Sequence, residues 1–532
     1  MRSLVLLTLV ACASRSPLEQ VRFANQDPVW RVDDRRDVPV PPKASSFNRY
    51  SYHFNSYYQH VKKALSLRGT KRARGVNALD EVPDSTWFTN RIGAREVSPD
   101  EIRRGPGPST PEAHLPWTIV KAKVGGTQVG FIVEDSRGVK FLLKFDTASL
   151  PELETGADAI VARLLWAAGY NVPADHIVYF KREDLKIKPG VKGLDAAKVD
   201  KALERVAIEN GKIRGIASVF ITGEILGGTP RLGTRKDDPN DRIRHELRRD
   251  QRGQASLFAW LAHTDTKEDN TLDTWQADPA DPKVHYVKHY LLDFGNALGA
   301  DVLLSNHLYL GHHYEIDPAM ALMQIASFGL ISRPWEKRTI SPLRGVGFYA
   351  IDDYDPATWK PSTPAQLPVI WADHYDKFWG SKILIRFTRD QIAAAVDAAR
   401  FTDPRAAEFM TNMLIARQRK TARHWFAQVN PVDDFTFKDG ALCFTDLAIK
   451  HELTQRPTTF VVTAFDSEVK PLGVRSAVSP DQLGRACLEP KLSSRPDRYT
   501  IVQIESSRGM PGTLVYLAMA NGTPRVIGLH RL

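Results

Sequence analysis

Two short stretches in the middle of the chain bring together residues that suit phosphate chemistry. The first lies between His263 and Asn270 and contains Asp265 and Lys267, and the second is Asp293-Phe294-Gly295. Phosphoryl transfer needs little covalent help from a protein, but it needs carboxylates, amides and cations that position the phosphates and neutralise their charge. The two stretches supply these residue types and therefore indicate that class of chemistry.

A further candidate lies upstream, where Leu142-Leu143-Lys144-Phe145 places a lysine inside an apolar strand. An unpaired ammonium is costly to bury, so Lys144 is expected to have an acidic partner. The helix expected next carries Asp158 on its apolar side, aimed inward. Asp158 is therefore the first choice of partner, with Glu154 and Glu152 as alternatives.

The elements expected around these residues follow one another in a definite order. Turn residues separate three β-rich runs, a helix follows, and a long helix later leads into the Asp265 loop and two short strands. The expected ranges are Trp117 to Val124, Gln128 to Glu134 and Val139 to Phe145 for the strands, Pro151 to Ala168 and Asp241 to Ala262 for the helices, and Asn270 to Trp275 and Val284 to Leu292 for the last two strands.

In this order, and in the spacing of Asp265, Lys267 and Asn270 before Asp-Phe-Gly, the chain resembles the protein-kinase-like superfamily from about Trp117 to Gly299. The resemblance implies an α+β, two-lobed fold. Residues 117–235 would form a β-rich N-lobe, and residues 236–432 would form a helical C-lobe that carries the catalytic loop.

The resemblance also implies a role for each residue in the two stretches. Asp265 would orient the acceptor hydroxyl as a base, and Lys267 would steady the transferred phosphoryl group. Asn270 and Asp293 would hold Mg²⁺ or Mn²⁺, the metal that accompanies ATP.

The β-rich lobe would contribute the nucleotide-binding residues. By the same resemblance, Lys144 would contact the α and β phosphates of ATP while paired to Asp158. Gly125, Gly126 and Gly130 lie on the hairpin before the lysine, where a phosphate-covering loop belongs, although they form GGxxxG rather than GxGxxG.

Some features depart from the common kinase pattern. Thr264 replaces the usual arginine, and no Ala-Pro-Glu motif follows Asp293, so the likeness is to atypical kinases such as the HipA-like and CotH-like groups. If the register differs, Asp269 and Asp273 are the alternative site acids. His263 is expected to support the loop, as the corresponding histidine of the family does.

The N-terminus resembles a bacterial lipoprotein signal. After Met1 and Arg2 comes a short apolar run that ends in Leu9-Val10-Ala11-Cys12, and a run this short cannot span a bilayer in a helix. The resemblance implies a signal peptide over residues 1–11, a lipid on Cys12 that attaches the protein to a membrane, and a place in the bacterial envelope facing the periplasm or the exterior. An ordinary signal peptide is the alternative, and it also predicts export.

Two further regions flank the kinase-like part. Residues 12–116 form a Pro- and Arg-rich extension with one aromatic-rich helix near Tyr50 to Leu67, whose basic residues either face solvent or touch anionic headgroups. Residues 433–532 contain short β-rich runs and predict a small all-β domain. Cys443 and Cys487 lie there, either as a disulfide in an oxidising compartment or as two buried thiols in a reducing one.

Composition sets the outer limits of the interpretation. A chain of 532 residues is too long for one hydrophobic core, so more than one domain is expected. Its 42% hydrophobic and 25% charged residues are typical of folded domains. The net charge of +10 is spread thinly and does not imply nucleic acid, and no CxxC or HExxH motif supports a zinc enzyme. The sequence thus predicts an envelope-anchored atypical kinase acting on an unknown protein or small-molecule acceptor; the alternative is a kinase-shaped binding or scaffold lipoprotein without catalysis.

Overall fold

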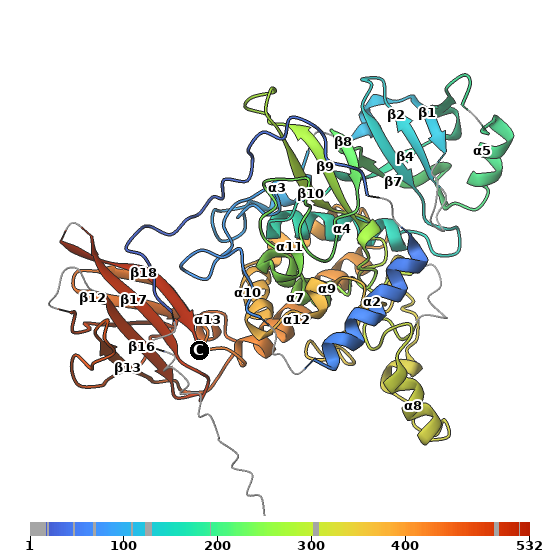
Figure 1. The fold of residues 1–532 in the computed structure, drawn as a ribbon. Helices are drawn as coiled ribbons and strands as arrows, with labels where there is room; N and C mark the ends of the chain where they lie inside the picture. The colour runs from blue at the N-terminus through green and yellow to red at the C-terminus, as the bar shows by residue number, and fades with distance from the viewer. Residues whose placement is uncertain are drawn as a thin grey trace, which may run out of the picture. The chain divides into compact units, whose positions relative to one another are not determined.

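The computed structural model describes residue 18 and residues 21–45, 48–66, 71–107, 110–122, 130–191, 193–301, 308–493, 499–520 and 522–532. The expected signal peptide, Cys12, Gly125 and Gly126 lie outside the described residues. The chain falls into two compact units, which we treat separately (Figure 1). The two-lobed unit contains Trp30–Val76 and Val82–Trp425, and the β unit contains Phe426–Leu532, Asn77–Glu81 and the described residues up to Val29.

The first lobe of the two-lobed unit is built on a seven-stranded sheet. Its strand order is β4-β7-β3-β2-β1-β5, with β6 paired to β7. The strands are β1 (Trp117–Ala122), β2 (Gly130–Glu134), β3 (Lys140–Lys144), β4 (Asp175–Phe180), β5 (Leu185–Ile187), β6 (Ile208–Glu209) and β7 (Lys212–Val219).

Strand alternation gives the two faces of this sheet different tasks. Phe141 and Leu143 of β3 point into the main apolar core of the lobe, where α5 (Ala196–Leu203) also packs. Lys144 therefore points to the opposite face, because successive side chains of a strand alternate. The long helix α4 (Leu153–Ala168) lies on that face, where its Ala159 packs against strands β4 and β7.

The second lobe is mainly helical and carries a three-stranded sheet, β10-β9-β8. Its strands are β8 (Glu224–Gly227), β9 (Thr271–Ala277) and β10 (His285–Leu291), and its helices from the middle of the chain onward are α6 (Arg249–Arg252), α7 (Gln254–Trp260), α8 (Pro318–Ala326), α9 (Leu367–Ile370), α10 (His374–Leu384), α11 (Arg389–Asp397) and α12 (Pro404–Phe426). The expected hairpin before Asp293 is the β9–β10 pair.

Most of the N-terminal extension, from Trp30 onward except Asn77–Glu81, is part of the two-lobed unit. It contributes α2 (Arg49–Ala64) and α3 (Pro99–Arg104). Its irregular segments run along the three-stranded sheet, where the Val38 amide donates to the His285 carbonyl at 2.7 Å and the Ser45 amide donates to the Leu226 carbonyl at 2.8 Å.

The expected helix from Asp241 to Ala262 is wrong as one element, because it is divided into a 3-10 turn and the short helices α6 and α7. Arg248 has an extended backbone, with φ −75° and ψ 129°, which ends the turn before α6. Gly253 lies between α6 and α7, where an added Cβ would fall 2.3 Å from the Trp379 ring. Tertiary packing therefore overrides the apolar helical pattern here.

Two other helical expectations are also corrected. The helix expected near Lys198 to Asn210 ends at Leu203, because the chain then enters the β6–β7 hairpin. In the region from Tyr314 to Val429, no α-helix lies between Ala326 and Leu367, where loops pack around the Asp265 loop instead.

The β unit consists of two antiparallel sheets, β11-β12-β15 and β14-β13-β16-β17-β18, with one short helix, α13 (Leu447–Lys450). Its strands are β11 (Val432–Lys438), β12 (Ala441–Asp446), β13 (Phe460–Phe465), β14 (Ser476–Val478), β15 (Arg485–Leu488), β16 (Thr500–Ser506), β17 (Thr513–Ala520) and β18 (Thr523–Arg531). The α+β class with further β sheets at the C-terminus is thus confirmed. Among the described residues, no helix is both long and apolar enough to cross a membrane.

A disulfide joins Cys443 of β12 to Cys487 of β15, which lie directly opposite each other in the sheet. The bond closes a loop with a sequence separation of 44 residues. Constraining such a loop in the unfolded chain stabilises a domain by about 2–4 kcal/mol.

We therefore expect a reducing agent to lower the free energy of unfolding of the β unit by about 2–4 kcal/mol. Hydrogen exchange at the amides of β16 and β17 in urea measures this unit separately. The Cys443→Ala/Cys487→Ala variant should show the lowered stability and no response to reductant. Wild-type exchange that is insensitive to reductant would contradict the expectation.

Candidate active site

The centre of the candidate site is the buried ammonium of Lys144, at the end of β3. Its Nζ donates to Asp158 Oδ2 at 3.0 Å and to Asp293 Oδ1 at 2.8 Å. Burial alone would lower the pKa of Lys144, but Asp158 and Asp293 outweigh it and raise that pKa. The amine is therefore held protonated between an acid of α4 and the acid that follows β10.

A cavity of about 300 Å³ opens beside this lysine, between the two lobes of the unit. Lys144, Asp158, Asp269 and Asp293 line it together with a mostly apolar wall. The wall includes Leu142, Val219, Phe220, Ile225, Leu272 and Leu292. Small-molecule sites are typically such concave apolar cavities with a few converging polar groups.

Asp293 reaches the cavity through an unusual backbone conformation. Its φ of +58° is in the left-handed region, which aspartate tolerates better than most residues. The next amide, that of Phe294, donates to Asp158 Oδ1 at 3.0 Å, and the Phe294 ring is buried. Asp158 thus binds both Lys144 and the Asp-Phe-Gly backbone, while the Asp293 carboxylate stays 49% exposed.

The Asp265 loop presents the second group of predicted residues. Lys267 Nζ lies 2.7 Å from Asp265 Oδ2, and both side chains are about one-third exposed, at 30% and 28%. Asn270 Nδ2 donates to the Asp265 carbonyl at 2.7 Å, and the Leu292 amide donates to the Asn270 carbonyl at 2.9 Å. These bonds tie the loop to the residue just before Asp293.

His263 packs against the same loop. It is buried, and its ring makes edge contacts with Phe258 of α7 at 4.8 Å and Phe294 at 5.6 Å between centroids. Burial lowers the pKa of His263 to about 4, so the ring is neutral at physiological pH. It packs the Asp265 loop against the Asp-Phe-Gly segment.

The structure also places the alternative acids. Glu152 is bound to Thr402 and Arg344, with its Oε1 2.9 Å from Arg344 Nε. Burial, with the nearby Asp146, raises the pKa of Glu154 to about 8. Of the three candidate acids, Asp158 is the one that accepts a hydrogen bond from Lys144, at 3.0 Å.

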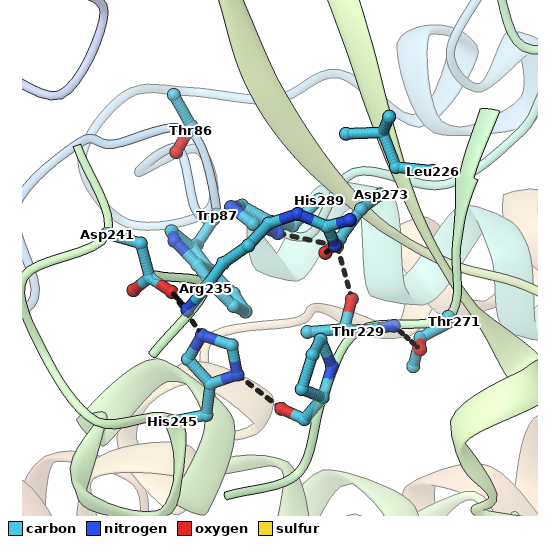
Figure 2. A network of polar contacts seen from close by, with 12 residues as sticks. Thr86, Trp87, Leu226, Thr229, Arg235, Asp241, His245, Thr271, Asp273 and His289 are labelled. Atoms are coloured by element: carbon cyan, nitrogen blue, oxygen red, sulfur yellow. Dashed lines mark hydrogen bonds and ion pairs between the residues drawn. The ribbon is translucent and has the colours of Figure 1, made fainter. Parts of the chain in front are cut away.

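The alternative Asp273 lies elsewhere, in a buried polar network (Figure 2). Its Oδ1 lies 2.7 Å from His289 Nδ1 and accepts from Thr229 at 2.5 Å, and its Oδ2 accepts from Arg235 at 3.0 Å. The Trp87 ring of the extension stacks on His289 at 3.5 Å between centroids. The network fixes the β9–β10 hairpin, and Asn270 and Asp293 lie at the two ends of that hairpin. Asp273 therefore helps to position these two residues.

Among the predicted glycines, Gly130 is described and lies in β2, directly opposite Lys144 in the sheet. Gly125 and Gly126 precede it outside the described residues. Their expected role as a phosphate-covering loop stays a prediction.

Sequence reasoning missed Asp175, which begins β4 and also lines the cavity. It is buried and bonded to the Ser218 side chain, while its Oδ1 has no hydrogen-bond partner within the described part of the chain. Burial and the nearby Asp158 raise the pKa of Asp175 well above its usual value. A neutral carboxyl group offers one O–H donor and one carbonyl acceptor to a ligand. The pairing of β4 with β7 that creates this pair has no short-range signal in the sequence.

The amide oxygen of Asn270 and the carboxylate of Asp293 are ligand types that suit Mg²⁺ or Mn²⁺; Asp293 lines the cavity and Asn270 does not. Both metals are hard ions that take oxygen ligands, and Mg²⁺ commonly binds one or two protein oxygens together with water and phosphate. No group of three or more His, Cys, Asp or Glu side chains is placed to hold a metal within the described ranges. An amide and a half-exposed carboxylate suit an ion that arrives with phosphate.

No family model and no curated protein matches the chain. The Rio2 kinase–ADP/Mg²⁺–phosphoaspartate complex from Chaetomium thermophilum is 14% identical over 54% of this chain and 71% of that chain, with a TM-score of 0.22. The Golgi casein kinase with Mn/ADP bound is 12% identical over 59% and 71%, with a TM-score of 0.29. Both neighbours are kinases.

The protonation of Asp175 can be tested by the pH dependence of stability. The folded state keeps a proton that the unfolded carboxyl, with a pKa of 3.8, has released, so the contribution of Asp175 to wild-type stability falls as pH rises above about 4. Relative to Asp175→Asn, we expect a loss of about 1.4 kcal/mol per pH unit while the folded carboxyl stays protonated. Urea unfolding at pH 5, 6 and 7 measures the difference.

Asp135→Asn is the matched control for this experiment. Burial opposes ionisation of Asp135, but hydrogen bonds from Arg137 and Val139 lower its pKa, so it is ionised in both states above pH 5. Its stability difference should be flat over the same range. A flat difference for Asp175→Asn as well would show that Asp175 is ionised in the cavity.

Proposed function

We propose that this protein is an atypical kinase that transfers a phosphoryl group from ATP, with Mg²⁺ or Mn²⁺, to an acceptor hydroxyl. The observation that carries the proposal is the position of Lys144 between Asp158 and Asp293 at the wall of the cavity. This arrangement suits a nucleoside triphosphate. The apolar wall can contact the flat face of the base, while the protonated amine and the half-exposed carboxylate lie where the charged phosphates and their metal would bind.

In this proposal the β-rich lobe binds the nucleotide. Leu142 and Val219, with Leu272 from the other lobe, would enclose the base, and the Asp175–Ser218 pair would offer it a hydrogen-bonding group. Lys144 would neutralise phosphate charge while Asp158 holds its amine in place. Because Asp158 also accepts from the Phe294 amide, the same acid would set the position of Asp293.

The Asp265 loop would serve the acceptor. The partly exposed Asp265 carboxylate can accept the proton of an acceptor hydroxyl, and Lys267 places a positive charge beside it for the transferred group. Asn270 and Asp293 would hold the metal, which neutralises the phosphate oxygens when it is bound.

The further parts of the proposal come from the sequence. We assign the chain to the atypical kinases of HipA-like or CotH-like type, anchored in the bacterial envelope by a lipid on Cys12 and acting on a protein or small-molecule acceptor there. The alternative is a nucleotide-binding scaffold lipoprotein without catalysis.

Nucleotide binding can be measured by unfolding with and without ATP and excess Mg²⁺ or Mn²⁺. At ten times its Kd, ATP should raise the free energy of unfolding by about 1.4 kcal/mol, because it binds only the folded state. The rise should need the metal and should disappear in Lys144→Ala and Asp293→Ala.

Asp281→Ala is the control, since this exposed acid lies in the β9–β10 loop and does not line the cavity. It should respond to ATP like the wild type. Normal ATP and metal binding by Asp293→Ala would overturn the site assignment.

Catalysis can be separated from binding with Asp265→Asn. Removing a positioned base typically slows proton transfer by about 10²–10⁴-fold, so phosphoryl transfer from γ-labelled ATP should fall by about that factor while ATP binding persists. Asp269→Asn tests the alternative register: if it abolishes transfer while Asp265→Asn does not, Asp269 takes the role. Nucleotide binding by the wild type without any transfer to envelope extracts would favour the scaffold alternative.

A further inference from the structure

One face of α2 exposes a continuous apolar stripe to solvent. Its members are Tyr50 (90% exposed), Phe54 (77%), Tyr58 (54%), Val61 (51%) and Leu65 (78%), the last just beyond the helix end. At 3.6 residues per turn these five positions fall within an arc of about 80°. Single exposed apolar residues are common, but an ordered row of aromatic and aliphatic side chains marks an interaction surface.

The opposite face holds α2 in this orientation. Tyr52 and Ser56 are buried, and the Tyr52 hydroxyl accepts from the Glu268 amide at 2.7 Å. The Arg231 guanidinium lies 4.1 Å from the centre of the Tyr52 ring. The packed side of the helix is thus occupied by the Asp265 loop region, and the apolar stripe necessarily faces outward.

A second apolar segment lies beside α2. No residue of α8 is buried, and Leu322 (71%), Ile325 (74%), Phe328 (91%) and Leu330 (86%) are exposed on α8 and the turn after it. Figure 1 shows α8 projecting away from the rest of its lobe.

Contacts just before α8 connect it to α2. The Ile316 amide donates to the Tyr57 hydroxyl at 3.1 Å, and the His60 and Tyr314 rings meet at 5.2 Å. The segment that leads into α8 therefore lies against α2, and we call the stripe of α2 together with the exposed residues of α8 and its turn the α2–α8 surface.

The charges around this surface are mainly positive. Helix α2 contains no acidic residue and ends with Lys62 and Lys63. No acid lies in residues 318–335 either. The acids at the two ends of that segment are paired, Asp317 with Lys360 at 2.9 Å and Glu336 with Arg333 at 2.8 Å, while Glu315 just before them is exposed.

We propose that the α2–α8 surface binds an anionic lipid bilayer. Apolar side chains would enter the interfacial region while Lys62 and Lys63 meet lipid headgroups, the combination that typifies interfacial helices. The basic margin favours anionic lipid over a second copy of this basic chain, which would bring like charges together. The proposal does not depend on the proposed kinase function.

Vesicle co-sedimentation tests the surface with the full chain carrying Cys12→Ser, so that no lipid is attached. The Cys12→Ser protein without further substitutions should bind phosphatidylglycerol vesicles at least tenfold more strongly than phosphatidylcholine vesicles. Adding 0.5 M NaCl should weaken this binding. Phe54→Glu/Leu65→Glu and Ile325→Glu/Phe328→Glu should each reduce binding at least tenfold. These positions are exposed, so the variants should fold.

Val474→Glu/Leu483→Glu is the matched control, because these residues of the β unit are 93% and 75% exposed. It should bind vesicles like the unsubstituted surface. Equal binding to both lipids, or no binding to either, would overturn the proposal.

An environment-sensitive dye distinguishes a bilayer from a protein partner. With Cys12→Ser in place and Cys443 bonded to Cys487, Phe328→Cys introduces the single free thiol. An NBD label there should shift to the blue on phosphatidylglycerol vesicles, and a label at Val474→Cys should not. A blue shift without vesicles, together with dimers that Phe54→Glu/Leu65→Glu abolishes, would overturn the proposal in favour of a second copy.

Discussion

The buried ammonium of Lys144 is the constraint that organises the candidate site. Removing one partner from a buried ion pair costs about 3–5 kcal/mol, because the remaining charge is left in a poorly solvated place. The side chain of Asp158 is only 3% exposed, so Asp158 provides most of the stabilisation of the Lys144 ammonium. Asp293 is 49% exposed and screened by water, so it stabilises the ammonium less. Asp293 can therefore move away from Lys144 without leaving the ammonium unpaired.

The rest of the two-lobed unit holds α4 and the end of the β9–β10 hairpin at this lysine. Asp158 is fixed by α4, and its second oxygen holds the Phe294 amide. The β9–β10 hairpin is fixed at its far side by Asp273 and His289, on which the Trp87 ring of the extension stacks. A site made from distant parts of the chain thus depends on packing that begins near residue 30, which explains why most of the extension belongs to the same unit.

Much of the centre could be predicted because its signals are local. A lysine in an apolar strand and an acid on the apolar side of the next helix indicate a pair, and the structure brings Lys144 and Asp158 together. Asp175 could not be predicted, since its place depends on β4 pairing with β7 some forty residues later in the chain. The break at Gly253 was missed for a similar reason, because the Trp379 ring that packs there comes from a distant helix.

Helix α2 buries a face that its sequence pattern would not assign to the core. Its apolar row would normally be assigned to the core, yet here the buried face carries Tyr52 and Ser56 and the apolar row is exposed. Tyr52 can be buried because its hydroxyl accepts a hydrogen bond from the Glu268 amide and its ring packs against the Arg231 guanidinium. The same helix therefore contacts the Asp265 loop on one side and offers an apolar stripe on the other. A surface that binds lipid through this stripe would hold the Asp265 loop close to the bilayer.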